Sequence, residues 1–236
     1  MGLFDIGHVA KLHEIQAARL SAGQEGISPE VEELIRRLEM GGVNQWRIQA
    51  KRLWDKSFGR DPAVNAKNFK VYLAGIPQIP EGLIKDDSDL RLLSLADPRP
   101  GLLRSCKLLG IQFEELGYND SSVEPFDNRF AIPTTPFWFR HDDGRRNRKR
   151  RPDHCRDELV GDIQTGSAME GIYAYAHHPD IVTVGEHLVD LPGSVRRGAR
   201  DGCAFLGVWG GQVKLGVDRD SDFACPGYGS LRLRRK

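Results

Sequence analysis

Apolar residues recur with helical spacing in the first part of the chain. Residues 27–42 read ISPEVEELIRRLEMGG, in which Ser28 can cap a helix, Pro29 suits its first position and two glycines can end it. The apolar residues of this stretch fall at i, i+3, i+4 and i+7: Val31, Leu34, Ile35 and Leu38. This spacing is typical of a helix that packs one face on a core.

Two further helices are expected at 43–56 and 62–74. Trp46 and Trp54 lie eight positions apart and share one face of the first helix, which favours core packing over a ligand platform. An Asp-Pro pair is placed to open the second helix.

Residues 75–82, GIPQIPEG, interrupt the helical pattern with two prolines and two glycines. These residue types most often break regular structure. We therefore expect a boundary here, between a helical N-terminal part over 1–80 and a C-terminal domain over 81–236.

Short helices and strands follow one another in the C-terminal domain. Strands are expected at 90–97 (LRLLSLAD) and 137–140 (FWFR), because both stretches have the apolar density of buried strands. Helices are expected after Pro100 and from Pro152, since proline is favoured at the first helical turn.

The remaining pattern predicts one more helix and more strands. Ser167 and Glu170 form the capping box of a helix. A strand is expected near 181–189, DLPGS at 190–194 is expected as a turn, and Gly210-Gly211 can join the two strands of a hairpin. Because helices and strands do not alternate regularly, we predict an α+β fold with short antiparallel strands, on which the helical part packs.

The composition of the 236 residues is that of a globular protein, with 39% hydrophobic and 28% charged residues. No apolar run approaches the roughly 20 residues of a membrane span, and the start, MGLFDIGHVAK, lacks the pattern of a secretory signal. We expect a cytoplasmic protein without a membrane segment. The four cysteines are far apart and are expected to be free thiols. A zinc site from Cys155, Cys203, Cys225 and His154 or His141 is the alternative.

The net charge of +1 conceals an uneven distribution. Residues 81–127 carry five basic and ten acidic residues, whereas residues 128–236 carry 18 basic and 14 acidic ones. A mildly basic C-terminal part can attract polyanions locally, although a constitutive nucleic-acid-binding protein is usually more basic overall.

The strongest charge feature is the basic block RRNRKRR at 145–151. Six of its seven residues are positively charged: Arg145, Arg146, Arg148, Lys149, Arg150 and Arg151. Such a run favours solvent or a counter-anion, and arginine favours bidentate contact to phosphate or carboxylate. The alternative is a solvated loop whose arginines pair with the protein's own acids at 120–127 and 142–143.

A second arginine cluster follows the expected turn at 190–194. Its Pro-Gly-Ser turn can present backbone N–H groups to an anion, with Arg196 and Arg197 beside it. A plain hairpin turn is the alternative. The chain also ends in a basic stretch, and three arginine-rich segments in one domain favour an anion-facing surface.

Complete catalytic or nucleotide-binding motifs are absent from the sequence. The candidates for chemistry are His141, Asp142 and Asp143, because a histidine beside two carboxylates can have a raised pKa and act in acid-base catalysis. A simple hydrogen-bonding role for His141 is the alternative. His177 and His178 end a helix, where its dipole favours the charged imidazole.

A divalent-metal site is a weaker interpretation of the same acids. Asp142 and Asp143 with Asp120 or Asp127 would supply oxygen ligands, but their spacing matches no standard loop, so no metal is predicted.

Seven short motifs keep a characteristic order: LGYND, PFD, FWFRHDDGRRNRKRRP, MEG, DLPGS, LGVW and GYGS. In this order the chain resembles a family of hypothetical bacterial proteins defined by a domain of unknown function, over about residues 72–230. The chain departs from the family at Leu231, where a small residue is usual. The resemblance implies a cytosolic bacterial protein with a single structural unit over 81–230, and it implies no activity or cofactor.

Three functions remain open from the sequence. The first is a binding protein for an anion, above all nucleic-acid phosphate, through the basic block with Arg196 and Arg197. The second is an enzyme on a phosphorylated or nucleotide substrate, which requires a pocket where His141, Asp142 and an arginine converge. The third is a structural or protein-interaction module, which is favoured if the arginines form ion pairs within the chain.

Overall fold

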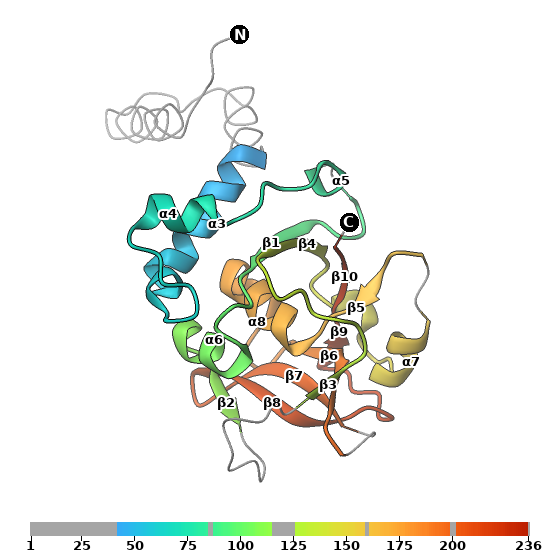
Figure 1. The fold of residues 1–236 in the computed structure, drawn as a ribbon. Coiled ribbons are helices and arrows are strands. Elements are labelled where there is room, and N and C mark those ends of the chain that lie inside the picture. Colours follow the sequence, from blue (N-terminus) through green and yellow to red (C-terminus); the bar gives the residue numbers. More distant parts are fainter. Residues whose placement is uncertain (1–41, 85–86, 115–125, 159–160, 199–201, 236) are drawn as a thin grey trace, which may run out of the picture.

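The computed structural model describes residues 42–84, 87–114, 126–158, 161–198 and 202–235. The helix expected from Ser28 lies outside these residues. The architecture is α+β, as predicted: two β-sheets lie on either side of a central helix, and further helices cover the outside (Figure 1). None of the helices within the described residues is both long and apolar enough to cross a membrane.

The smaller sheet has four antiparallel strands in the order β1-β4-β10-β5. Its members are β1 (Leu92–Ala96), β4 (Phe137–His141), β10 (Arg232–Arg234) and β5 (Gln164–Thr165). The strands predicted from LRLLSLAD and FWFR are thus confirmed, and they pair with each other. The last strand, β10, brings the C-terminus beside β4.

The larger sheet follows the order β2-β8-β7-β6-β3, and β9 also pairs with β6. Its strands are β2 (Gln112–Glu114), β8 (Gln212–Asp220), β7 (Gly202–Trp209), β6 (Leu188–Arg196), β3 (Phe126–Asn128) and β9 (Tyr228–Ser230). Two of the pairings, β2 with β8 and β6 with β9, are parallel. The predicted hairpin of β7 and β8 is confirmed, and both turn glycines, Gly210 and Gly211, have positive φ.

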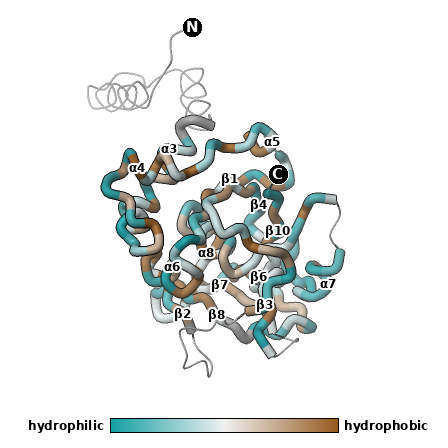
Figure 2. Tube along the Cα trace, in the orientation of Figure 1, coloured by the Kyte–Doolittle hydropathy of each residue, from teal (hydrophilic) through white to brown (hydrophobic). Residues whose placement is uncertain are grey.

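Helices fill the space between and around the sheets. They are α3 (Gly42–Asp55), α4 (Phe69–Ala74), α5 (Glu81–Ile84), α6 (Leu102–Leu109), α7 (Pro152–Asp157) and α8 (Ala168–His177), with 3-10 turns η1 (Phe58–Arg60), η2 (Arg145–Asn147) and η3 (Pro179–Ile181). Helix α8 starts with the predicted capping box of Ser167 and Glu170 and is buried over most of its length. By contrast, α7 is a hydrophilic element at the surface (Figure 2).

The helical segment 42–84 shares one hydrophobic core with the two sheets. The Trp46 indole donates to Ile76 O (3.1 Å), and the Trp138 indole of β4 donates to Pro77 O (2.8 Å). The buried Arg140 guanidinium donates to Leu83 O (2.6 Å) at the end of α5. The segment 75–82 is therefore tied to both the helices before it and the strands after it.

Two local predictions are wrong. No helix starts at Pro62, because the Asp61 side chain accepts from Ala63 N in a turn and Asn68 caps α4 instead. The sequence DLPGS is not a turn either, since residues 190–194 lie inside β6, with an irregular register opposite β7. The bulge accommodates Pro192 within the strand. Strand β6 spans Leu188–Arg196, later in the chain than the strand expected near 181–189.

A close backbone contact joins the segment after β4 to β9. A Cβ on Gly144 would lie 2.6 Å from Gly229 O, and a Cβ on Gly229 would lie 2.1 Å from Gly144 O. Both distances are shorter than those at which a Cβ atom contacts another atom in real proteins. Neither position therefore has room for a side chain. Gly144 also has φ of 76°, which disfavours other residues.

We predict that Gly144→Ala destabilises the protein far more than Gly185→Ala. The two glycines have nearly the same positive φ, 76° and 73°, but the space around Gly185 is open. The left-handed backbone alone costs about 1 kcal/mol, and overpacking against Gly229 adds about 1–3 kcal/mol. Urea unfolding of both variants measures the difference. Equal losses of stability would contradict the close contact.

Candidate anion-binding site

The basic block is a folded segment held at both ends. It forms the turn η2 and ends where Arg151 precedes the first residue of α7. The Asn147 amide donates to Ser230 O (2.8 Å), and Lys149 N donates to Cys225 O (3.3 Å). The block is therefore fastened to the segment around β9 as well as to its chain neighbours.

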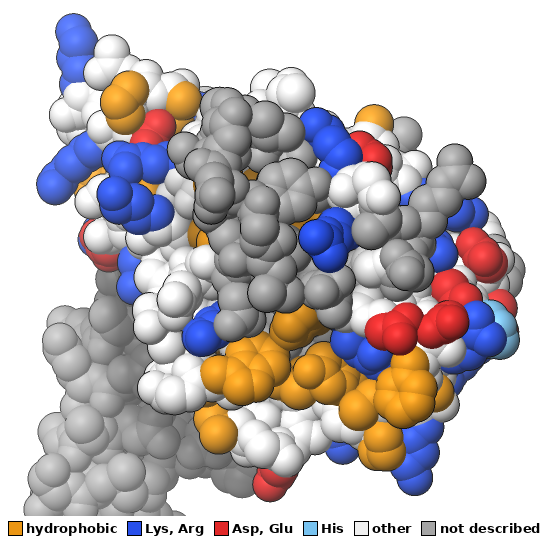
Figure 3. Space-filling view, turned by 90° about the horizontal axis from the view of Figure 1, so that it is seen from below, with side chains coloured by type: hydrophobic (Ala, Val, Ile, Leu, Met, Phe, Trp, Pro, Cys, Tyr) orange, Lys and Arg blue, Asp and Glu red, His pale blue; other side chains and the backbone are white. Residues whose placement is uncertain are grey.

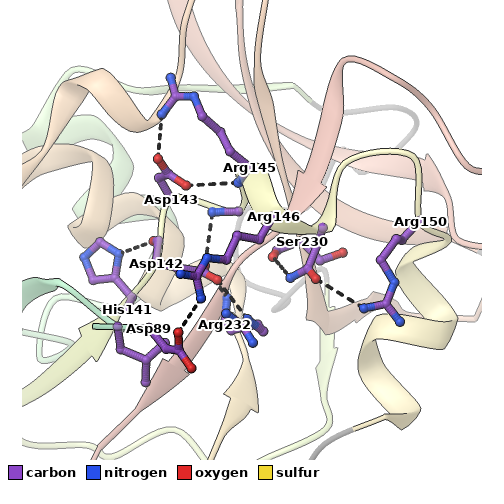
Figure 4. Close-up of polar contacts among 12 residues, drawn as sticks. Asp89, His141, Asp142, Asp143, Arg145, Arg146, Arg150, Ser230 and Arg232 are labelled. Atoms are coloured by element: carbon purple, nitrogen blue, oxygen red, sulfur yellow. Dashed lines mark hydrogen bonds and ion pairs between the residues drawn. The ribbon is translucent and has the colours of Figure 1, made fainter. Parts of the chain in front are cut away.

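Asp142 is the buried anchor of this segment (Figure 4). One carboxylate oxygen accepts from Gly144 N (3.0 Å) and from Arg232 N (2.9 Å), and the other accepts from Arg232 Nε (2.8 Å). Burial raises the pKa of Asp142, although the hydrogen bonds from Arg232 act in the opposite direction. The carboxylate thus joins β4, the turn after it and β10.

Most charges of the basic block are compensated within the chain. Four arginines pair with carboxylates: Arg145 with Asp143, Arg146 with Asp89, Arg150 with Glu158, and Arg151 with Asp153. Arg148 donates to the His187 ring and to Glu186 O. Each exposed pair contributes little to stability, but together they leave only Arg148 and Lys149 of the block without a carboxylate partner among the described residues. This is the arrangement that the third function, a structural or interaction module, requires.

His141 is fully buried and has both ring nitrogens engaged. They lie 2.9 Å from Ser94 Oγ and 2.7 Å from Asp142 O. Burial, with His178 nearby, lowers the pKa of His141 to about 3, so the expectation of a raised pKa is wrong. His177 and His178 end α8, as expected. The expectation that the helix dipole keeps their imidazoles charged is wrong, because burial lowers the pKa of both.

A cavity of about 470 Å³ lies beside the basic block. Its lining comprises Asp89, Arg91, Leu92, Asp142, Asp143, Arg145, Arg146 and Asp180. Among the described residues of this lining, four carboxylates outnumber three guanidiniums. The enzyme hypothesis requires a pocket where His141, Asp142 and an arginine converge. Asp142 and three arginines do line this cavity, but the His141 imidazole does not.

A larger hollow, of about 600 Å³, lies between β3, α7 and the end of β6. It is lined by Asp127, Asn128, Arg129, Arg156, Asp157, Val195, Arg196 and Gly198. We call this hollow the arginine groove. Among the described residues of this lining, three guanidiniums outnumber two carboxylates, the opposite of the cavity beside the basic block.

One carboxylate serves two of the guanidiniums in the arginine groove. Asp157 Oδ1 lies 3.4 Å from Arg129 Nη2 and 3.9 Å from Arg156 Nε. Arg156 Nη1 is buried without a hydrogen-bond partner among the described residues. Such an atom retains the capacity to donate a hydrogen bond, and its desolvation is not offset.

The structure places the predicted flanking arginines at the same groove. Arg196 lines it, and Arg197 Nε lies 3.1 Å from Asp127 Oδ1. The proposed anion nest of the Pro-Gly-Ser sequence is wrong, because Gly193 N donates to Gly166 O (3.0 Å) and Ser194 is buried. Ser194 Oγ accepts from Ala168 N instead.

The described part of the chain contains no group of three or more metal-ligating side chains. The weaker metal interpretation also involved Asp120, which lies outside the described residues. Asp127 pairs with Arg197, and Asp142 with Arg232. The four cysteines are free thiols, as expected, and three of them are buried.

A second buried charge pair lies beneath α7. Asp190 on β6 is fully buried, and its carboxylate is 3.2 Å from Arg219 Nε on β8. Burial raises the pKa of Asp190 to about 7, although Arg219 offsets part of the effect. The Arg219 guanidinium also donates to Asp220 O and Phe223 O, both at 2.8 Å.

No family model, no curated protein and no solved structure matches the chain. The resemblance to a family of hypothetical bacterial proteins therefore remains an expectation. The site has to be interpreted from its own geometry.

No sequence pattern marked two of the groove residues, Arg129 and Arg156, as part of a site. Each is a single arginine in a segment without a motif, and only the packing of α7 beside β3 and β6 brings them together. Asp190 appeared in the sequence only as part of a supposed turn, and its partner Arg219 lies 29 positions later.

We predict that Asp190 makes the protein less stable as the pH rises from about 4 to about 7. The folded pKa, about 7, is above the ordinary value of 3.8, so the native state binds the proton more tightly. This contribution is full below pH 4 and is lost by about pH 7, amounting to about 4 kcal/mol. Asp190→Asn should remove it.

Urea unfolding of the parent and Asp190→Asn at several pH values tests this sign. The difference in free energy of unfolding between parent and variant should fall with rising pH. The other carboxylates titrate in both proteins, so their effects cancel. A difference that does not change with pH would contradict the assignment.

Proposed function

We propose that the protein binds an anionic ligand in the arginine groove, with phosphate groups of nucleic acid as the ligand class that we favour. The observation that carries the proposal is that Arg129, Arg156 and Arg196, from three separate segments of the chain, line one hollow of about 600 Å³. This volume is in the range of ligand sites. Guanidinium groups suit phosphate because they offer paired donors in a plane.

The balance of charges supports the arginine groove over the basic block. Four of the five arginines of the block have carboxylates of their own, and a phosphate would have to displace these. In the groove, Arg129 and Arg156 share the single carboxylate of Asp157. An incoming anion would therefore meet an uncompensated positive charge in the groove.

A thermal-shift screen tests binding. The probes are inorganic phosphate, pyrophosphate, nucleotides and short single- and double-stranded oligonucleotides. A ligand at 100 times its Kd stabilises the native state by about 2.7 kcal/mol, which corresponds to about 5–10 °C in Tm for a chain of this size. If none of these probes raises Tm, the proposal is wrong.

Two variants locate the site. Replacing Arg129, Arg156 and Arg196 with glutamine should abolish the shift, because it removes the positive lining of the groove. Arg146→Gln with Arg150→Gln is the matched control, since both arginines are exposed and paired with acids. The control should keep most of the shift. Loss of binding in the control and retention in the groove variant would place the site in the basic block instead.

A further inference from the structure

The outer face of the larger sheet carries an exposed aromatic cluster. Along β7, alternate residues point to opposite faces: Leu206 is fully buried in the core, whereas Trp209 is 37% exposed. Phe205 lies on the same side as Trp209. In the view from below the molecule, hydrophobic side chains gather on one side of the surface, with acidic and basic side chains at the border (Figure 3).

Two glycines let the aromatic rings lie against the strands. A Cβ on Gly207 would be 2.2 Å from the Trp209 ring, and a Cβ on Gly216 would be 2.2 Å from the Phe205 ring. Each ring therefore occupies the space above a glycine on the sheet surface. The rings are therefore held against the sheet on one side, and the opposite side of each ring can contact another molecule.

The cluster continues across the sheet to β9 and the loop before it. The Phe205 ring is 5.5 Å from Trp209 and 6.1 Å from Tyr228, both in edge-on geometry. The Arg219 guanidinium lies 4.5 Å from the centre of the Tyr228 ring and holds Phe223 O. Phe223 is 59% exposed. We call Phe205, Trp209, Phe223 and Tyr228 the aromatic face.

Carboxylates stand beside the aromatic face. Asp220 and Asp222 are exposed and close enough that a hydrogen bond with Asp220, together with its charge, raises the pKa of Asp222. Asp153 contributes to the same acidic field, and the nearby Arg151 is paired with Asp153. At the Phe223 end of the face, these three carboxylates thus lie around Arg151, while the Arg219 guanidinium beside Tyr228 is paired with the buried Asp190. Lys214 lies towards the Trp209 end, opposite Gly207.

We propose that the aromatic face is a docking surface for a basic peptide segment of a partner protein. Apolar side chains of the partner would pack on Trp209 and Phe223, and its Lys or Arg side chains would pair with Asp220 and Asp222. Tryptophan and tyrosine are prominent among residues that dominate protein interfaces. Complementary charge beside them selects the partner.

The same charges argue against two other occupants. Nucleic-acid bases stack on aromatic rings, but here the phosphates would meet carboxylates. A second copy of the chain would bring a second set of carboxylates to the contact, which is unfavourable. This docking surface is independent of the arginine groove, so either proposal can fail alone.

Selection from a random peptide library displayed on phage tests the proposal with the full chain as bait. We expect the enriched peptides to combine Lys or Arg with aliphatic or aromatic residues. A labelled synthetic copy of the most enriched peptide is then titrated by fluorescence polarisation. Trp209→Ala and Phe223→Ser should each weaken binding by at least about tenfold, and Asp220→Asn with Asp222→Asn should weaken it several-fold and reduce its salt dependence.

Val71→Ser is the matched control, because Val71 is a half-exposed hydrophobic residue on α4 rather than on the larger sheet. It should leave the affinity unchanged. Several results would overturn the proposal: no enrichment, acidic or neutral enriched sequences, or equal binding to Trp209→Ala. An oligonucleotide that binds through Trp209, or a dimer in sedimentation that Trp209→Ala dissociates, would assign the face to another occupant and also overturn it.

Discussion

The backbone contact between Gly144 and Gly229 is the constraint on which the charged half of the structure depends. It brings the turn after β4 directly against β9, and no side chain fits between them. Asp142 fastens this contact, because its carboxylate accepts hydrogen bonds from the turn and from β10. The start of the basic block and the end of the chain are consequently fixed to each other.

This constraint decides what the basic block can do. Held in place, its arginines reach acids from other segments, including Asp89 before β1 and Glu158 after α7. Four of the six positive charges of the block are thus paired with carboxylates of the described residues, which leaves Arg148 and Lys149. In the arginine groove, two guanidiniums share the carboxylate of Asp157.

The sequence predicted the fold class and most local elements, because capping boxes, glycine turns and buried apolar strands are local signals. The Ser167–Glu170 box and the Gly210-Gly211 turn were both confirmed. The prediction from the sequence was wrong at 190–194, where a bulge lets Pro192 and Gly193 continue a strand. Local turn propensity was overridden there by pairing with neighbouring strands.

The candidate site was only partly accessible from the sequence. Arg196 and Arg197 stood out as a pair, but nothing local connects them with Arg129 or Arg156. Ion pairing was predicted only in part: Asp143, the partner of Arg145, is among the acids expected at 142–143, but Asp89, the partner of Arg146, lies 57 positions away. The pKa of His141 depended on burial, which the two adjacent aspartates did not reveal.

The salt dependence of binding to a short DNA duplex tests the central claim most directly, that the arginine groove rather than the basic block meets phosphate. Three phosphate contacts predict a slope of about −3 when log affinity is plotted against log salt concentration. Each groove arginine replaced by glutamine should reduce the slope by about 1. A slope of about −5 that the groove substitutions leave unchanged would contradict the account and assign binding to the six charges of the basic block.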